Sequence, residues 1–233
     1  MAAPNNEKRR NAAMEPSSNP TTLPPPRIEE LSRRFFRKVM NRKNILSVGI
    51  SGATNSGKSS LTKKLAEYFP NSTSFCQDDY FRKVGSKNLE LIPELDCYNW
   101  DVLSALDTDK MVTDINQQAS SLAQTDKTVH LLLVDGFLIF NHRPLSEMFD
   151  RKYFLTVSKD VCMERRSNRV YDPPDCDGYF EKIAWPYYLK NLEAISDQKD
   201  IVYHDSDSNF LQIFETIKDD ITNLLKTKER DLC

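Results

Sequence analysis

The chain has 233 residues, 39% of them hydrophobic, which is enough for one globular domain with a core that needs no disulfides. The formal net charge is −2, and no apolar run approaches the roughly 20 residues that cross a bilayer, so no transmembrane segment is expected. The five cysteines lack CxxC spacing, which argues against a disulfide framework or a zinc site. We therefore expect reduced thiols and a cytoplasmic protein, with the nucleus as the alternative.

Residues 1–44 form a basic extension, with ten Lys and Arg against four Asp and Glu. Residues 1–26 are rich in Pro, Asn, Ser and Ala, and we expect them to be disordered. Apolar residues at steps of three and four predict a short basic amphipathic helix over 27–43, which we expect to dock on the domain. A solvated extension is favoured over one that binds nucleic acid or an anionic membrane. Met40 is a candidate alternative start, and the partner of the extension is left open.

The rest of the chain, 45–228, alternates strands and helices. Strands are predicted over residues 45–50, 72–76, 129–134, 153–157 and 201–203. Helices are predicted over residues 59–68, 102–122, 159–169, 179–197 and 210–226. This alternation predicts an α/β fold of the doubly wound P-loop type, with a mostly parallel five-stranded sheet, helices on both faces and a small lid.

A phosphate-binding loop follows the first strand, where GATNSGKSS matches GxxxxGK[ST] between a strand and a helix. Glycines let backbone N–H groups turn toward an anion, and the helix N-terminus adds its positive dipole end. We expect Lys58 to reach the β and γ phosphates of ATP and the Ser59 hydroxyl to ligate Mg²⁺. The predicted nucleotide-binding residues of this loop are Gly52, Ala53, Thr54, Asn55, Ser56, Gly57, Lys58, Ser59 and Ser60.

A second metal ligand is predicted where the apolar strand 129–134 runs into Asp135. An acid at the end of a buried strand beside a phosphate loop is typical of the Walker B position. An ordinary strand-to-loop turn is the alternative for Asp135 considered alone.

An acid at the end of the second strand is the candidate general base. The segment CQDDYF carries Asp78 and Asp79, and this strand end lies beside the phosphate loop in doubly wound sheets. A carboxylate that accepts the proton of an acceptor hydroxyl is the recurring solution for phosphoryl transfer. We assign that role to Asp78 and a turn-capping role to Asp79.

Arginines and helix breakers follow in KDVCMERRSNRVYDPPD. Arg165, Arg166 and Arg169 are expected on one helix, where guanidinium groups suit phosphates and vicinal hydroxyls. The prolines and Gly178 after it predict a mobile lid over about 165–178 that excludes water. A solvated charge run is the alternative.

Together these segments resemble the nicotinamide riboside kinases, a branch of the uridine kinase-like P-loop kinases. The resemblance spans roughly residues 45–205 and rests on GISGATNSGKSSL, QDDYF, YNWDVLSAL, LLLVDGFLIFN, the RRSNRVY lid string and WPYYLKN. The basic extension departs from the compact members of that family.

The resemblance implies roles for individual residues. Asp78 matches the catalytic acid, and Asp101 and Arg166 match residues that grip the ribose hydroxyls. Arg165 and Arg169 are assigned to the nucleotide side. The residues that match aromatic positions flanking the base are Phe81, Trp100 and Tyr171. Because the nicotinamide ring is cationic, aromatic faces beside it would gain about 0.5–2 kcal/mol.

These observations predict an ATP- and Mg²⁺-dependent kinase that phosphorylates the 5′-hydroxyl of nicotinamide riboside in NAD synthesis. A uridine or cytidine kinase on the same scaffold is the enzyme alternative. A nucleotide-binding interaction protein that uses the basic extension is the alternative from another class. The expected partners are a small nucleoside and ATP, and we expect no nucleic acid.

Overall fold

The computed structural model describes residues 43–125, 128–171, 174–207 and 209–232. The predictions for the extension, including the helix over 27–43 and the start at Met40, fall outside these residues. Within the described ranges, no helix is both long enough and apolar enough to cross a membrane.

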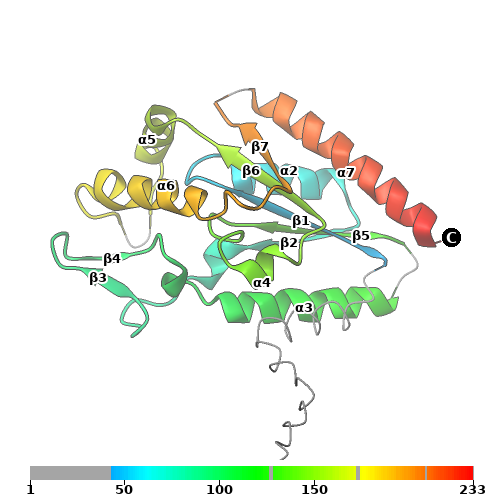
Figure 1. The fold of residues 1–233 in the computed structure, drawn as a ribbon, viewed down its shortest axis with the longest axis horizontal. Coiled ribbons are helices and arrows are strands. Elements are labelled where there is room, and N and C mark those ends of the chain that lie inside the picture. Colours follow the sequence, from blue (N-terminus) through cyan, green and yellow to red (C-terminus); the bar gives the residue numbers. More distant parts are fainter. Residues whose placement is uncertain (1–42, 126–127, 172–173, 208, 233) are drawn as a thin grey trace, which may run out of the picture.

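One five-stranded sheet organises the described chain (Figure 1). Its strands are β1 (Ile45–Gly52), β2 (Ser72–Cys76), β5 (His130–Asp135), β6 (Arg151–Thr156) and β7 (Ile201–Asp205). They lie in the order β2-β5-β1-β6-β7, and every neighbouring pair is parallel. The predicted α/β fold with a five-stranded parallel sheet is therefore confirmed.

Helices cover both faces of the sheet, as Figure 1 shows. On one face, α2 (Lys58–Tyr68) and α7 (Phe210–Leu232) share an apolar cluster with Leu46, Val48 and Ile50 of β1. On the other face, α3 (Thr108–Thr125) and α4 (Arg143–Ser146) share a second cluster with Ile45. Successive side chains of a strand point to opposite faces, so a fully buried β1 feeds both clusters.

The helix predicted over 102–122 was wrong at its start. A 3₁₀ turn over Leu103–Ala105 comes first, and α3 begins only at Thr108. Between them Leu106 is extended and buried, and it forms a β-bridge with Phe81. Tertiary pairing with the chain after β2 therefore overrides the local helical pattern.

Two other helices also differ from the prediction. Helix α5 (Lys159–Ser167) ends before Arg169, and the Asn168 side chain donates to the Glu164 carbonyl at this end. The helix predicted over 179–197 consists of a π-helix over Phe180–Ala184 followed by α6 (Trp185–Glu193). Pro186, in the first turn of α6, has no N–H to donate, which favours a change of hydrogen-bond pattern there.

An antiparallel hairpin of β3 (Glu90–Ile92) and β4 (Cys97–Asn99) was not predicted, because three-residue strands are too short to show periodicity. Cys97 on β4 is disulfide-bonded to Cys176, with Cα atoms 6.4 Å apart. The expectation of reduced thiols is therefore wrong for this pair. The two cysteines are 79 positions apart in the sequence, so local spacing gives no signal for the bond.

Reduction of the Cys97–Cys176 disulfide is expected to lower the free energy of unfolding by about 2–4 kcal/mol, because it releases a long loop in the unfolded chain. Urea unfolding with and without dithiothreitol measures the difference. Cys97→Ser should unfold at the same urea concentration in both conditions. Equal midpoints for the unmutated protein with and without reductant would contradict the expectation.

Candidate functional site

A cavity of about 550 Å³ lies at the carboxyl ends of β1, β2 and β5, where ligands bind in open α/β sheets. It collects side chains from the phosphate loop and the start of α2, the turn after β2, the segment directly after β4, the end of β5, and α5 with the segment that follows it. The lining residues are Thr54, Asn55, Lys58, Ser59, Asp78, Phe81, Arg82, Lys83, Val84, Trp100, Asp101, Asp135, Phe137, Arg166, Arg169, Val170, Tyr171, Asp175 and Tyr179.

The phosphate loop has the predicted strand–loop–helix context. Gly52 ends β1 with φ 146°, and a Cβ there would lie 2.3 Å from the Leu155 carbonyl oxygen. Gly57, with φ 93°, caps α2, which begins at Lys58. Both positions require glycine, and the free N–H groups of the first turn of α2 lie at the loop. The geometry suits an anion at this helix N-terminus.

Lys58 is held inside this loop. Its ammonium donates to the Ala53 carbonyl oxygen at 2.7 Å. Burial lowers the pKa of Lys58, while the nearby Asp78 and Asp135 carboxylates favour its charged form. The lysine is therefore positioned between the loop and two acids.

The two predicted metal ligands, Ser59 and Asp135, lie next to each other. The Ser59 hydroxyl donates to Asp135 Oδ1 at 2.9 Å. Burial raises the pKa of Asp135, and the hydrogen bond from Ser59 and the charge of Lys58 oppose this shift. Among the described residues, no group of three or more His, Cys, Asp or Glu could hold a metal. An oxygen pair with few protein ligands fits Mg²⁺, which retains waters and binds phosphates.

Asp78 lies in the 3₁₀ turn Gln77–Tyr80, directly after β2. Its carboxylate is half-exposed and lines the cavity, and Arg169 Nη2 is 3.8 Å from its Oδ2. Asp79 does not line the cavity. The two adjacent acids therefore differ in position, because Asp78 lines the cavity and Asp79 does not.

The three lid arginines do not share one helix, contrary to the prediction. Arg166, on α5, donates to the Asp175 carboxylate at 2.7 and 2.8 Å and to the Thr54 hydroxyl at 3.1 Å. Arg169 lies beyond the end of α5 and still reaches the cavity. Arg165 donates to the main-chain carbonyls of Asn55 and Ser206 and does not line the cavity.

Aromatic side chains form one wall of the cavity. Phe81 packs edge-to-face on Trp100, with ring centroids 5.7 Å apart, and stacks on Phe137 at 5.9 Å. Tyr171 lines the cavity too, but its hydroxyl accepts from Asn55 Nδ2 at 3.0 Å, and its ring lies 4.3 Å from the Arg166 guanidinium carbon. Tyr171 thus contacts the phosphate loop and a lid arginine, which the sequence did not predict.

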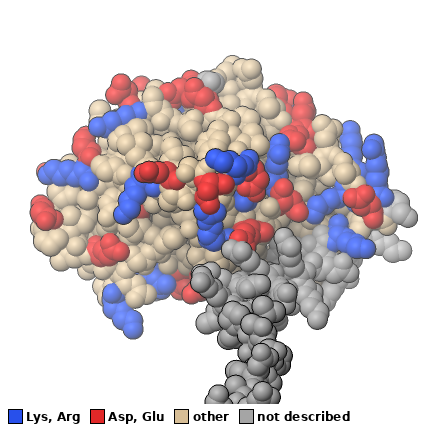
Figure 2. Space-filling view, in the orientation of Figure 1, with Lys and Arg blue, Asp and Glu red and all other residues tan. Residues whose placement is uncertain are grey.

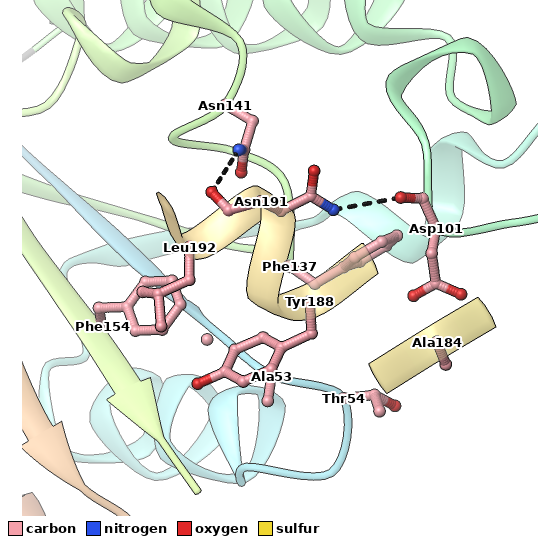
Figure 3. A pocket seen from close by; sticks show the side chains of 11 residues that line it. Ala53, Thr54, Asp101, Phe137, Asn141, Phe154, Ala184, Tyr188, Asn191 and Leu192 are labelled. Atoms are coloured by element: carbon pink, nitrogen blue, oxygen red, sulfur yellow. Dashed lines mark hydrogen bonds between the residues drawn. The ribbon is translucent and has the colours of Figure 1, made fainter. Parts of the chain in front are cut away.

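Asp101 follows Trp100 and points into the same cavity. It also borders a smaller cavity of about 20 Å³ behind the phosphate loop, which Figure 3 shows with Asn141 and Asn191. Burial raises the pKa of Asp101, and the Tyr179 hydroxyl and the Arg166 charge lower it. Asp101 and Arg166 therefore line the same cavity.

Sequence reasoning missed several lining residues. Phe137 comes two residues after Asp135, so its place beside the strand end was a usable signal. Asp175 lies in the segment predicted as a lid and Tyr179 begins the helix predicted over 179–197, but neither residue belonged to a motif that indicates a site. Gly52, Ala53, Ser56, Gly57 and Ser60 shape the loop or begin the helix and do not line the larger cavity.

Charges of both signs are interspersed over the face in Figure 2, and the cavity is mixed in the same way. Its cations are Lys58, Arg82, Lys83, Arg166 and Arg169, and its acids are Asp78, Asp101, Asp135 and Asp175. Such a lining suits a ligand with separate anionic, polar and cationic parts better than a uniform polyanion.

Sequence comparison with known proteins finds relatives of this chain. The chain is 38% identical over 194 residues to nicotinamide riboside kinase 1 of Homo sapiens, covering 78% of this chain and 94% of that protein. It is 33% identical to human nicotinamide riboside kinase 2, covering 80% and 85%. Uridine kinase of Chlamydia pneumoniae is more distant, at 26% over 79% of this chain and 94% of that protein.

A solved sugar kinase structure from Janibacter sp. HTCC2649 aligns with a TM-score of 0.49 at 14% identity, covering 74% of this chain and 92% of that one. No family model matches the chain.

Proposed function

The chain belongs to the nicotinamide riboside kinase family, and on that premise we propose that it transfers the γ-phosphoryl group of ATP to the 5′-hydroxyl of nicotinamide riboside. The product would be nicotinamide mononucleotide, a precursor of NAD. One observation carries the proposal: Lys58, Asp78, Asp101 and Asp135 line one cavity together with Trp100. The cavity would then hold the phosphates of ATP beside the nucleoside.

The phosphate side of the cavity would bind ATP. The loop N–H groups and the N-terminus of α2 would hold the phosphates, and Lys58 would leave the Ala53 carbonyl for the β and γ oxygens. Ser59 and Asp135 would hold Mg²⁺, which would supply positive charge to the phosphate oxygens. Arg169 would approach the transferred group from the lid, and Arg165 would support the loop from outside.

The acceptor side would hold the nucleoside. Asp78 would accept the proton of the 5′-hydroxyl while the oxygen of that hydroxyl bonds to the γ phosphorus. The bond between the γ phosphorus and the β-γ bridging oxygen would break, and ADP would leave. Asp101 and Arg166 would bind the ribose hydroxyls. Phe81 and Trp100 would face the cationic ring, and Tyr171 would close over the loop from the lid.

A nucleoside panel tests the substrate. We expect kcat/KM for nicotinamide riboside to exceed that for uridine and cytidine, because a cation gains from the aromatic wall and a neutral pyrimidine gains less. Trp100→Leu should lower kcat/KM for nicotinamide riboside by about 2- to 30-fold and leave uridine less affected. A protein that phosphorylates uridine far better than nicotinamide riboside would overturn the proposal.

Removal of divalent cations tests the metal. Excess EDTA is expected to abolish turnover, and Mg²⁺ added beyond the chelator should restore it, because the metal would supply positive charge that offsets the negative charge of the phosphate oxygens. Asp135→Asn should raise the Mg²⁺ concentration needed for half-maximal rate. Full activity in EDTA would contradict the assignment of Ser59 and Asp135.

A further inference from the structure

Tyr179 lies where the segment after α5 enters the π-helix, and it has no part in the roles assigned so far. Its residue is 3% exposed, and it packs in an apolar cluster with Phe180 and Ala184. Tyr179 nevertheless lines the larger cavity, together with Trp100 and Asp101. A tyrosine with a buried ring and a polar end at a ligand site invites a specific role for the hydroxyl.

Two hydrogen bonds fix the Tyr179 hydroxyl. It accepts a hydrogen bond from the Trp100 main-chain N–H at 2.8 Å and donates to Asp101 Oδ2 at 2.8 Å. A phenol has a single proton, so acceptance from the amide leaves that proton for the carboxylate. The Tyr179 side chain therefore links Trp100 of the aromatic wall to Asp101, the acid assigned to the ribose.

The main chain of Asp101 is held separately, as Figure 3 shows. Asn191 on α6 donates through its side-chain Nδ2 to the main-chain carbonyl oxygen of Asp101 at 3.2 Å. The main-chain carbonyl oxygen of Asn191 in turn accepts from Asn141 Nδ2 at 2.8 Å. These bonds fix where Asp101 sits but leave the rotation of its carboxylate open. That terminal torsion is broad in aspartate, so the orientation depends on a partner for the carboxylate itself.

Among the described residues, Tyr179 is the one whose side chain donates a hydrogen bond to the Asp101 carboxylate. We propose that Tyr179 is a positioning residue for ribose recognition, which turns the Asp101 carboxylate so that its remaining lone pairs face the 2′- and 3′-hydroxyls. This inference rests on the proposed function, because it takes Asp101 as the ribose-binding acid. It also predicts that selectivity against deoxynucleosides depends on a residue that does not touch the ribose.

The charges around Asp101 give a second readout. Burial raises its pKa, and the Tyr179 hydrogen bond opposes that rise. The other ionisable groups that act on this carboxylate are Arg166 on α5, Asp175 in the lid segment and Lys58 on α2. The ionised carboxylate accepts hydrogen bonds from hydroxyls more strongly than the protonated acid does, so nucleoside binding weakens as pH falls through the pKa of Asp101. Loss of the Tyr179 hydroxyl should therefore move the acid limb of kcat/KM to higher pH.

Tyr179→Phe tests the inference, with Tyr203→Phe as the matched control. Phenylalanine keeps the buried ring, whereas Tyr203 is a partly exposed tyrosine on β7 that does not line the cavity. We expect Tyr179→Phe to raise KM for nicotinamide riboside about tenfold and to leave kcat within about threefold, as loss of one charged hydrogen bond implies. The preference for nicotinamide riboside over its 2′-deoxy analogue should fall by a similar factor. Tyr203→Phe should change neither.

A double-mutant cycle separates positioning from a general structural effect. In an Asp101→Asn background, Tyr179→Phe should have little further effect on the ribose preference, because both changes disable one interaction. An unchanged preference and pH profile in folded Tyr179→Phe, or additive effects in the cycle, would overturn the inference while the proposed function stands. Failure of the unmutated protein to bind or turn over nicotinamide riboside would overturn the function, and the inference with it.

Discussion

Asp78→Asn is expected to lower kcat for nicotinamide riboside by about 100- to 10,000-fold, the range for loss of a general base. The carboxylate is in the cavity beside Lys58, at the end of β2, where it can orient and deprotonate the 5′-hydroxyl. The amide keeps the shape but cannot accept the proton. Steady-state assays at saturating ATP and nucleoside would measure the change.

Asp79→Asn is the matched control for Asp78. Asp79 is the adjacent residue in the same turn and does not line the cavity, so this variant should keep kcat within about threefold. Nucleoside binding should survive in Asp78→Asn, since Asp101 and the aromatic wall are untouched. Wild-type turnover by Asp78→Asn would show that another group takes the proton.

Lys58→Met is expected to lower kcat by about 100- to 1,000-fold. This is the range for removal of one hydrogen-bond donor that stabilises negative charge in the transition state. The buried ammonium lies between the phosphate loop and the two acids, and methionine fills similar space without charge. Removing it also leaves Asp78 and Asp135 without a shared cation. Rates at saturating substrate would measure the loss.

Lys63→Met controls for the removal of a lysine from the same helix. Lys63 is exposed on α2, away from the cavity, and we expect an unchanged rate. Thermal melts of both variants would separate folding from catalysis. A Lys58→Met enzyme with normal kcat would contradict the placement of the lysine at the transferred phosphoryl group.

Local patterns were sufficient to predict the parts of the site that one segment builds. The phosphate loop needs two glycines, a lysine and a serine at fixed spacing between a strand and a helix, and all of that information is contiguous. Asp135 was predicted because an apolar strand runs into it. The parallel sheet was likewise predicted by the alternation of strands and helices.

The parts that depend on distant segments were missed or misplaced. Leu106 is extended because it bridges to Phe81, and Cys97 pairs with a residue 79 positions away. Tyr179 donates a hydrogen bond to Asp101, which is 78 positions away in the sequence. No periodicity or spacing in the sequence encodes these contacts, because each joins segments that only the tertiary fold brings together.

Product analysis is the most direct test of the central claim that this cavity transfers a phosphoryl group from ATP to nicotinamide riboside. Purified protein would be incubated with ATP, Mg²⁺ and nicotinamide riboside, and the phosphorus-containing products would be followed by ³¹P NMR. The account predicts ADP and nicotinamide mononucleotide in equal amounts, with the new phosphate on the 5′-oxygen. ADP and inorganic phosphate without the mononucleotide would contradict it.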